Sequence, residues 1–192
     1  MRSILLIFLL SFLFSGCSGD KSTEKAPPLP AEQRAAIESR LIGELSPSND
    51  RSGRERNDMI NYAIDEIWDV RPAPEGYFYQ VIEPGKGEPL MEGDLAALHY
   101  TGQFLDKTTF ADSKKSRRKL DFFVGQMIPA WNLALTSVKP GATIRLLVPS
   151  ELAYGAEGLV NGRGDTLVGA HQVLVFELSE IEVKERALEQ EW

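Results

Sequence analysis

The sequence predicts an α+β protein with a small helical segment ahead of a sheet. The prediction rests on a change of hydrophobic period along the 192 residues. Residues 31–70 carry apolar side chains at helical spacing, whereas most apolar segments beyond residue 76 alternate as β-strands do. Only one short helical pattern interrupts these strands. Such an order is typical of α+β proteins and not of proteins in which strands and helices alternate.

The first 16 residues have the pattern of a secretory signal. An apolar run at residues 4–14 follows a basic start and ends in Ser-Gly-Cys, whose cysteine, Cys17, is the only one in the chain. A membrane-spanning helix needs about 20 apolar residues. A signal peptide needs a basic start, about 7–15 apolar residues and small residues at the cleavage site. We therefore expect residues 1–16 to be removed.

Residues 14–17, Phe-Ser-Gly-Cys, resemble the lipobox of bacterial lipoproteins, although that family usually has Leu where Phe14 stands. The resemblance implies cleavage before Cys17 and a diacylglycerol on its sulfur, which would anchor the protein to a membrane. Ser18 resembles the residue that follows the cysteine in lipoproteins sent to the outer membrane. The expected location is extracytoplasmic, with the outer membrane favoured over the inner. An ordinary signal followed by a chance cysteine is the alternative.

A tether and a helical segment follow the anchor. Residues 17–30 are polar and proline-rich and predict a flexible tether. Within residues 31–74, apolar side chains recur every four residues at Ile37, Leu41 and Leu45, and a second helical stripe covers residues 59–68. The second stripe packs on the following domain, or else it is a client-binding arm or the contact of a homodimer formed through residues 31–70.

Five later segments have the pattern of strands: residues 77–82, 94–101, 120–124, 143–149 and 172–183. In the last, alternation places Val173, Val175, Glu177, Ser179 and Ile181 on one face and Leu174, Phe176 and Leu178 on the other. A short helix is expected to begin near Pro129, because proline is tolerated at the first helical position. Residues 186–192 are predicted to form a charged tail.

The composition excludes several classes of function. A net charge of −7 argues against binding to nucleic acid. One cysteine and two histidines provide neither a disulfide framework nor a metal site. The sequence has no P-loop, no G-x-S-x-G nucleophile elbow and no dinucleotide fingerprint. We therefore expect no cofactor and no hydrolytic or phosphoryl-transfer chemistry.

Five short motifs, taken in order, resemble those of the FKBP-type peptidyl-prolyl cis/trans isomerases. They are His99-Tyr100-Thr101-Gly102, Phe110-Ala111-Asp112-Ser113, Gly125-Gln126-Met127-Ile128-Pro129-Ala130-Trp131, Leu152-Ala153-Tyr154-Gly155 and Val173-Leu174-Val175-Phe176-Glu177-Leu178. The resemblance covers residues 77–183 and implies a domain at 75–185. It implies a twisted antiparallel sheet wrapped around the short helix, an apolar pocket between them, and an isomerase that assists the folding of proline-containing extracytoplasmic proteins.

The same resemblance assigns the site residues. Trp131 would form the floor of the pocket, and Tyr154 and the backbone N–H of Ile128 would donate hydrogen bonds to a substrate carbonyl. The walls would be Tyr100, Phe110, Met127, Ile128, Val168 and Phe176, with Leu120 beside them at a position where the family has Phe. The pocket uses binding energy alone, because a twisted amide needs no nucleophile, metal or cofactor.

Further positions depart from the family pattern. Ala111 stands where the family commonly has Asp, and Asp112 follows it. In a loop, a shift of one residue would return Asp112 to the site, whereas in a regular strand it would face away. Ala130 replaces a Gly, and Gly169-Ala170 replaces a pair of prolines. These changes predict weak or narrowed isomerase activity. They also leave open an envelope-tethered chaperone or binding module with little catalysis, or a lipoprotein that links envelope components and keeps only a vestigial pocket.

The segment at residues 114–119 has five cations among six residues, in an otherwise acidic chain. It is read as a solvated loop. The alternative is contact with anionic lipid headgroups or acidic clients, which attract each nearby cation by about 1 kcal/mol at a membrane surface.

Overall fold

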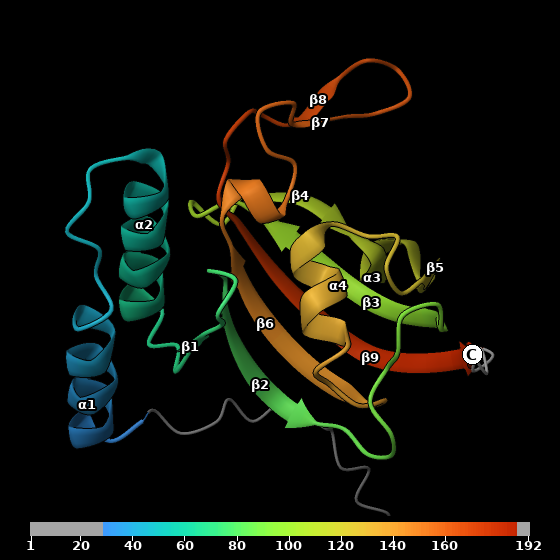
Figure 1. Ribbon diagram of the computed structural model, residues 1–192, viewed down its shortest axis with the longest axis horizontal. Helices are drawn as coiled ribbons and strands as arrows, with labels where there is room; N and C mark the ends of the chain where they lie inside the picture. Colours follow the sequence, from blue (N-terminus) through green and yellow to red (C-terminus); the bar gives the residue numbers. More distant parts are fainter. Residues whose placement is uncertain (1–28, 188–192) are drawn as a thin grey trace, which may run out of the picture.

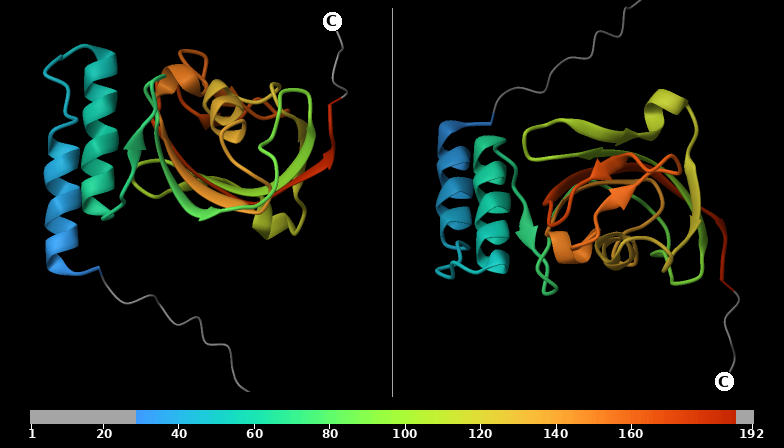
Figure 2. Two further views of the ribbon diagram at one scale, coloured as in Figure 1. Left: turned by 60° about the horizontal axis from the view of Figure 1, so that its bottom comes forward. Right: turned by 90° about the horizontal axis from the view of Figure 1, so that it is seen from above.

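The computed structural model describes residues 29–187, and it has the α+β architecture that the sequence predicts. A curved antiparallel sheet wraps around one short helix, α4 (Pro129–Leu135). Two further helices, α1 (Ala31–Ile42) and α2 (Arg51–Asp65), lie side by side against the other face of the sheet (Figures 1 and 2). Within residues 29–187, no helix is both long and apolar enough to cross a membrane.

The sheet contains more strands than the five expected. Its order is β1-β2-β6-β9-β3-β4, with β5 also paired to β3. The bounds are β1 (Arg71–Pro72), β2 (Phe78–Pro84), β3 (Leu95–Gln103), β4 (Thr109–Asp112), β5 (Leu120–Phe123), β6 (Ala142–Val148) and β9 (Leu174–Glu185). A separate hairpin of β7 (Leu159–Val160) and β8 (Thr166–Val168) extends from one end of the molecule (Figure 1). The unpredicted strands β1, β4, β7 and β8 have at most four residues each, too few to show an alternation.

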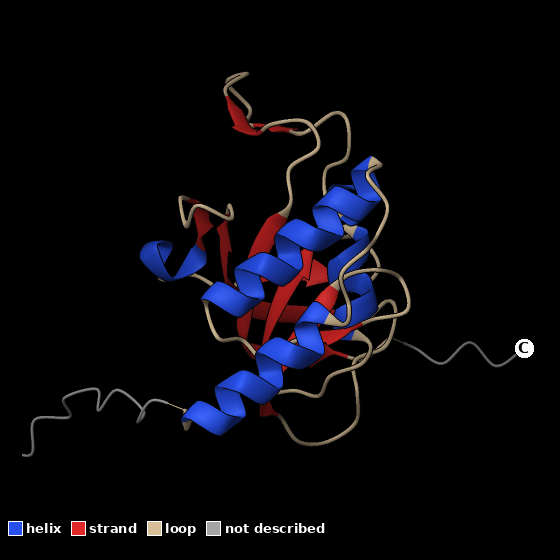
Figure 3. Ribbon diagram, turned by 90° about the vertical axis from the view of Figure 1, so that its left-hand side faces the viewer, coloured by secondary structure: helices blue, strands red, loops and turns tan. Residues whose placement is uncertain are grey.

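Both predicted helices of the N-terminal arm, which we define as residues 31–70, are present. α1 ends at Ile42, so Leu45 lies beyond the helix that its spacing predicted. α2 starts where the Asp50 carboxylate accepts a hydrogen bond from Gly53 N at 2.7 Å, as a helix cap does. Figure 3 shows the two helices lying side by side in front of the strands. Two shorter turns complete the described chain, α3 (Ser113–Ser116) and the 3₁₀ turn η1 (Ser150–Leu152).

Two apolar clusters lie on opposite faces of the sheet. The inner cluster surrounds α4 and includes Trp131, Leu146 and Phe176. The outer cluster joins the arm to the sheet through Met59 and Ile60 of α2, Phe78 of β2 and Val175 of β9, among others. The apolar stripe of the second arm helix therefore packs on the following domain, which was the first of the alternatives open to it. Successive residues of β9 enter different clusters because side chains alternate along a strand.

The predicted alternation along the last strand is wrong at Ile181. The register between β3 and β9 pairs His99 with Ser179 but Ala97 with Glu182, so β9 has one extra residue between these two pairs. Glu180 occupies that bulge with a left-handed backbone (φ 51°). The bulge turns Ile181 into the inner cluster, where it is 1% exposed, and away from the face shared by Val173 and Val175.

A buried carboxylate fastens the C-terminal end of the described chain to the sheet. Asp94 is fully buried at the start of β3, and its oxygens accept hydrogen bonds from Met91 N (2.9 Å), Arg186 Nη1 (2.9 Å) and Ala187 N (2.8 Å). Burial alone would raise the pKa of this carboxyl. The two backbone hydrogen bonds and the Arg186 charge outweigh burial, so the pKa of Asp94 is lowered.

We expect Asp94→Asn to lower the free energy of unfolding at pH 7 by about 2 kcal/mol, because hydrogen bonds to a charged group are lost. The folded-state pKa of Asp94 lies below the unfolded value of about 3.9. Its contribution is therefore present above about pH 4 and is lost as pH falls through the folded-state pKa. Urea unfolding at several pH values would measure the difference between the wild type and the variant, which should shrink as pH falls through the folded-state pKa. The same substitution at the exposed Asp58 is the control, and a difference that stays constant with pH would contradict this account.

Candidate functional site

The inner cluster contains a group of aromatic rings centred on Trp131, which is 2% exposed. The Tyr100 and Phe176 rings meet the indole edge-on, with centroids 5.2 and 5.3 Å from it. Phe110 in turn meets Phe176 edge-on at 5.9 Å. Edge-to-face pairs of this kind contribute about 0.5–1.5 kcal/mol each beyond the area that they bury. The structure thus gathers four of the predicted site residues from β3, β4, α4 and β9.

The start of α4 sets the position of the indole. Pro129 occupies the first turn, where its missing N–H leaves no helical hydrogen bond unmade. The Asn132 side chain then fixes the preceding loop, because its Oδ1 accepts from Gly125 N and Met127 N and its Nδ2 donates to Met127 O. None of the described residues accepts a hydrogen bond from the N–H of Ile128, the residue just before the helix. That backbone donor is free for a ligand.

A serine outside strand β3 hydrogen-bonds to the backbone of Tyr100. Ser113, at the start of α3, places its Oγ 2.8 Å from Tyr100 N and 3.0 Å from His99 Nδ1. Gly102 lies two residues after Tyr100 on the same strand, and a Cβ at this position would come within 2.6 Å of the Phe110 ring. The motif His99-Tyr100-Thr101-Gly102 therefore ends in glycine because the ring packs against its backbone.

Tyr154 lies just after η1 and is packed against the inner cluster while remaining partly exposed. Burial, together with the nearby Tyr100, raises the pKa of the Tyr154 hydroxyl above its ordinary value. The hydroxyl is therefore protonated at neutral pH and can donate a hydrogen bond. The indole N–H of Trp131 is buried and has no hydrogen-bond partner among the described residues.

The other predicted residues divide into three groups. Val168 is buried in the inner cluster, and Leu120, Met127 and Ile128 pack against it while partly exposed. Asp112 is occupied elsewhere, because its Oδ1 accepts from Lys114 N at 2.9 Å and from Lys115 N at 3.4 Å, which caps α3. Cys17 and the signal lie outside the described residues.

Several supporting residues were not predicted. The Phe104 ring is tilted by 45° against the Phe110 ring with centroids 5.2 Å apart, and the Phe122 and Trp131 centroids are 6.4 Å apart. Asn132 and Ser113 act through hydrogen bonds to backbone atoms. Asn132 follows a Pro-x-Trp helix start, where a side chain that reaches back to the preceding loop is a recognisable local signal. Ser113 has no such signal, because its partner Tyr100 lies 13 residues away on β3.

The basic segment at residues 114–119 is partly neutralised by acidic side chains. Lys119 Nζ lies 3.5 Å from Glu180 and 3.4 Å from Glu182, and Lys114 Nζ lies 3.7 Å from Glu177. Exposed ion pairs contribute little to stability, about 0–1 kcal/mol each. They do reduce the positive field of the segment, which favours the solvated interpretation over binding of anionic lipid.

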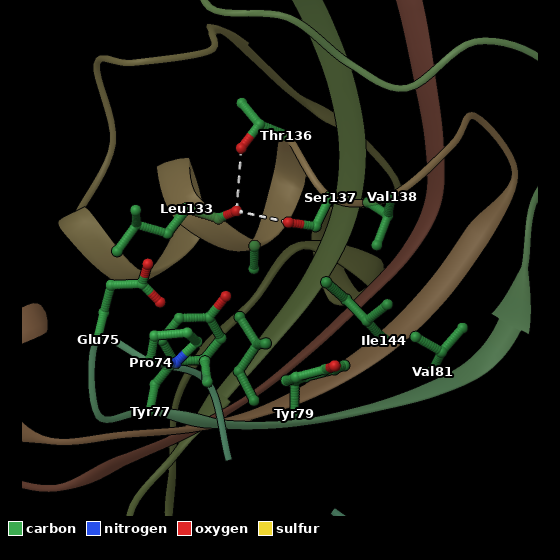
Figure 4. Close-up of a pocket in the computed structure, with 13 residues that line it drawn as sticks. Pro74, Glu75, Tyr77, Tyr79, Val81, Leu133, Thr136, Ser137, Val138 and Ile144 are labelled. Carbon is green, nitrogen blue, oxygen red and sulfur yellow. Dashed lines mark hydrogen bonds between the residues drawn. The ribbon is translucent and has the colours of Figure 1, made fainter. Parts of the chain in front are cut away.

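A cavity of about 470 Å³, separate from the aromatic group around Trp131, lies between α4 and strand β2 (Figure 4). We refer to it as the cavity behind α4. It is lined by Leu133 of α4, two residues after Trp131 and therefore about 200° around the helix from it. Tyr79 and Val81 of β2 line its other side. Burial, with help from Glu75 and Tyr79, raises the pKa of the lining residue Tyr77 to about 12, so its hydroxyl stays protonated.

The comparisons with known proteins agree with this geometry. The sequence model of the family described as FKBP-type peptidyl-prolyl cis-trans isomerase matches residues 86–181. The Escherichia coli K12 FKBP-type peptidyl-prolyl cis-trans isomerase FkpA is 33% identical over 115 residues, which are 60% of this chain and 40% of that protein. The Legionella longbeachae "Outer membrane protein MIP" is 34% identical over 59% of this chain and 47% of its own length. The chain therefore spans less than half the length of these two relatives.

Solved structures give the same result. The crystal structure of Escherichia coli FkpA has a TM-score of 0.60 at 27% identity, covering 80% of this chain and 65% of that chain. A peptidyl-prolyl cis-trans isomerase from Pseudomonas syringae has a TM-score of 0.58 at 29% identity, covering 72% of this chain and 96% of that chain. Because the family match spans half of the sequence and contains the aromatic group around Trp131, the chain belongs to the FKBP-type peptidyl-prolyl cis-trans isomerase family.

Proposed function

We propose that the protein is a peptidyl-prolyl cis/trans isomerase that assists the folding of extracytoplasmic proteins. One observation carries the proposal: inside the family match, buried Trp131 packs against the partly exposed Tyr100 ring, and neither its indole N–H nor the Ile128 N–H has an acceptor among the described residues. An X–Pro segment would lie on this surface with its flat proline ring against the indole. The pocket walls would be Tyr100, Phe110, Met127, Ile128, Val168 and Phe176, with Leu120 at the rim.

The chemistry required is rotation about one amide bond. Resonance stiffens that bond and gives a barrier of about 18–20 kcal/mol, so uncatalysed rotation takes tens to hundreds of seconds. The planar amide is the more polar form, and water stabilises its separated charge. A site that excludes water and binds the twisted form more tightly than either planar form lowers the barrier.

Two donors would stabilise the substrate carbonyl during rotation. The Tyr154 hydroxyl is protonated at neutral pH, and the Ile128 N–H has no acceptor among the described residues. Asp112 is not assigned a direct role, because its carboxylate caps α3. With Ala111 next to the Phe110 ring and Gly169-Ala170 before β9, the site lacks a carboxylate and a rigid loop that the family commonly has, and we propose weak or narrowed activity.

Tyr154→Phe keeps the ring but removes the donor, so we expect kcat/KM for a proline peptide to fall about two- to tenfold, the equivalent of one hydrogen bond. Trp131→Ala should lower it further by removing the floor. A protease-coupled proline-peptide assay on the full chain in detergent measures both. Tyr79→Phe is the matched control, since this phenol lines the cavity behind α4. Equal activities of wild type, Tyr154→Phe and Trp131→Ala would sink the site assignment.

We further propose that Cys17 carries a lipid that anchors the protein to a membrane of the cell envelope, outside the cytoplasm. The outer membrane is favoured over the inner membrane. The lipobox-like residues 14–17 support this, as does a relative whose name is "Outer membrane protein MIP". The arm is the proposed contact of a homodimer. Exposed apolar side chains support that contact, with Ile42 51% exposed and Leu45 and Ile67 each 39% exposed.

Mass spectrometry of the N-terminal peptide tests the anchor. Wild-type protein should begin at Cys17 and carry the mass of two or three acyl chains, which together bind a membrane stably. Cys17→Ser should abolish that mass, whereas Ser18→Ala should leave it in place. An unmodified cysteine in wild-type protein from a bacterial envelope would refute the lipoprotein assignment.

A second candidate is an envelope-tethered chaperone or binding module with little catalytic activity. The cavity behind α4 favours it, because its apolar lining suits an apolar side chain of a partly folded client and its phenolic hydroxyls can hydrogen-bond to the client's backbone. That cavity is separate from the Trp131 rings, since Leu133 faces the other side of α4. Binding there would continue without catalysis.

Val81→Glu would place a charge at the lip of the cavity, where Val81 is 43% exposed. If the cavity holds clients, the variant should suppress the aggregation of an unfolded test protein about tenfold less well, as expected when a carboxylate is set against an apolar ligand. Its kcat/KM should stay unchanged. Ile82→Glu is the control, because Ile82 is equally exposed on the same strand but does not line the cavity. Equal loss in both variants would count against a client site.

A further inference from the structure

One buried charged side chain joins the N-terminal arm to the turn that carries Tyr154. Glu55 of α2 is 6% exposed, and its two carboxylate oxygens accept hydrogen bonds from one residue, Ser150 of η1. The Oε2···Ser150 N distance is 2.8 Å and the Oε1···Ser150 Oγ distance is 2.7 Å. Burying a carboxylate is unfavourable unless hydrogen bonds compensate it. Here both oxygens have a donor, so the contact is well defined.

Ser150 is also the start of a hydrogen-bonded path through the Tyr154 turn. Its carbonyl accepts from Ala153 N at 3.1 Å and from Gly155 N at 2.8 Å, which closes the turn on either side of Tyr154. The Gly155 carbonyl then accepts from His171 N at 2.8 Å, which joins the turn to the segment before β9. A displacement of Ser150 would therefore move both neighbours of Tyr154.

We infer that Glu55 is a positioning residue for the proposed isomerase site and that the arm is part of that site's framework. The inference rests on the proposed function of Tyr154. It goes beyond the family resemblance, because the family match begins at residue 86 and Glu55 precedes it. Glu55 acts through Ser150 and the turn, and it does not itself contact the substrate.

A double-mutant cycle on the full chain in detergent tests this role. Glu55→Ala should lower kcat/KM about fivefold by releasing the turn, while Glu55→Gln, which keeps one acceptor for Ser150 N, should stay within about twofold. In the Tyr154→Phe background, Glu55→Ala should have almost no further effect, since two residues that act through one group are not additive. Full additivity of the two losses would overturn the inference.

Two further variants separate positioning from loss of stability. Ile60→Ala weakens the packing of the same helix, because Ile60 is fully buried in the outer cluster. At temperatures where it is folded, it should keep kcat/KM within about twofold of wild type despite its lower stability. A loss equal to that of Glu55→Ala would reduce Glu55 to a structural residue. Ser150→Ala removes only the hydroxyl bond and should fall between wild type and Glu55→Ala, even if Glu55→Ala itself folds poorly.

Hydrogen exchange gives a readout that does not depend on catalysis. The Gly155 and His171 amides should exchange faster in Glu55→Ala but not in Ile60→Ala, relative to amides of β3. If wild-type protein does not accelerate proline isomerisation, the proposed function fails, and the exchange data alone then decide whether Glu55 holds the turn. Unchanged exchange at both amides in Glu55→Ala would overturn the inference, whatever the activity.

Discussion

The architecture depends on burial of strand β9 on both faces. β9 pairs with β3 on one side and with β6 on the other, so backbone hydrogen bonds fix both of its neighbouring strands. Phe176 points to Trp131, whereas Val175 next to it packs in the outer cluster with α2. Interiors of this density transmit small displacements. The arm and the aromatic site are therefore two sides of one strand, although they are far apart in sequence.

Much of this arrangement was predictable from the sequence, because the spacing of apolar residues along each short segment indicates a strand or a helix. The alternation along residues 173–178 predicted a strand with two faces, and the structure confirms this strand as β9, which is buried on both faces. The helical stripe at residues 59–68 and the proline that opens α4 are equally local signals. The alternation failed at Ile181, because a bulge adds one residue without changing composition. Glu180 adopts a left-handed backbone there with no glycine to announce it.

The site could be predicted only in part. Residues within short motifs were predicted, whereas contacts between residues far apart in the sequence were not. The order of aromatic motifs predicted the rings that meet at Trp131, because each motif is a short pattern of residue types. The polar supports escaped prediction, since Glu55 and Ser150 are 95 residues apart and neither belongs to a motif. Asp112 shows the opposite case. The backbone amides of Lys114 and Lys115 donate to its Oδ1, and such local bonds compete with any role across the site.

Covering the sheet and orienting the turn place different demands on the arm. Covering Phe78 and Val175 requires apolar side chains of about the right volume, and many helices would satisfy that requirement. The contact from Glu55 to Ser150 requires a side-chain oxygen acceptor at one position, since a buried Ser150 N–H left without an acceptor would be unfavourable by about 1–3 kcal/mol. A helix that served only as cover would avoid a buried charge. Its presence beside the Tyr154 turn is better explained by a requirement for orientation than by a requirement for burial.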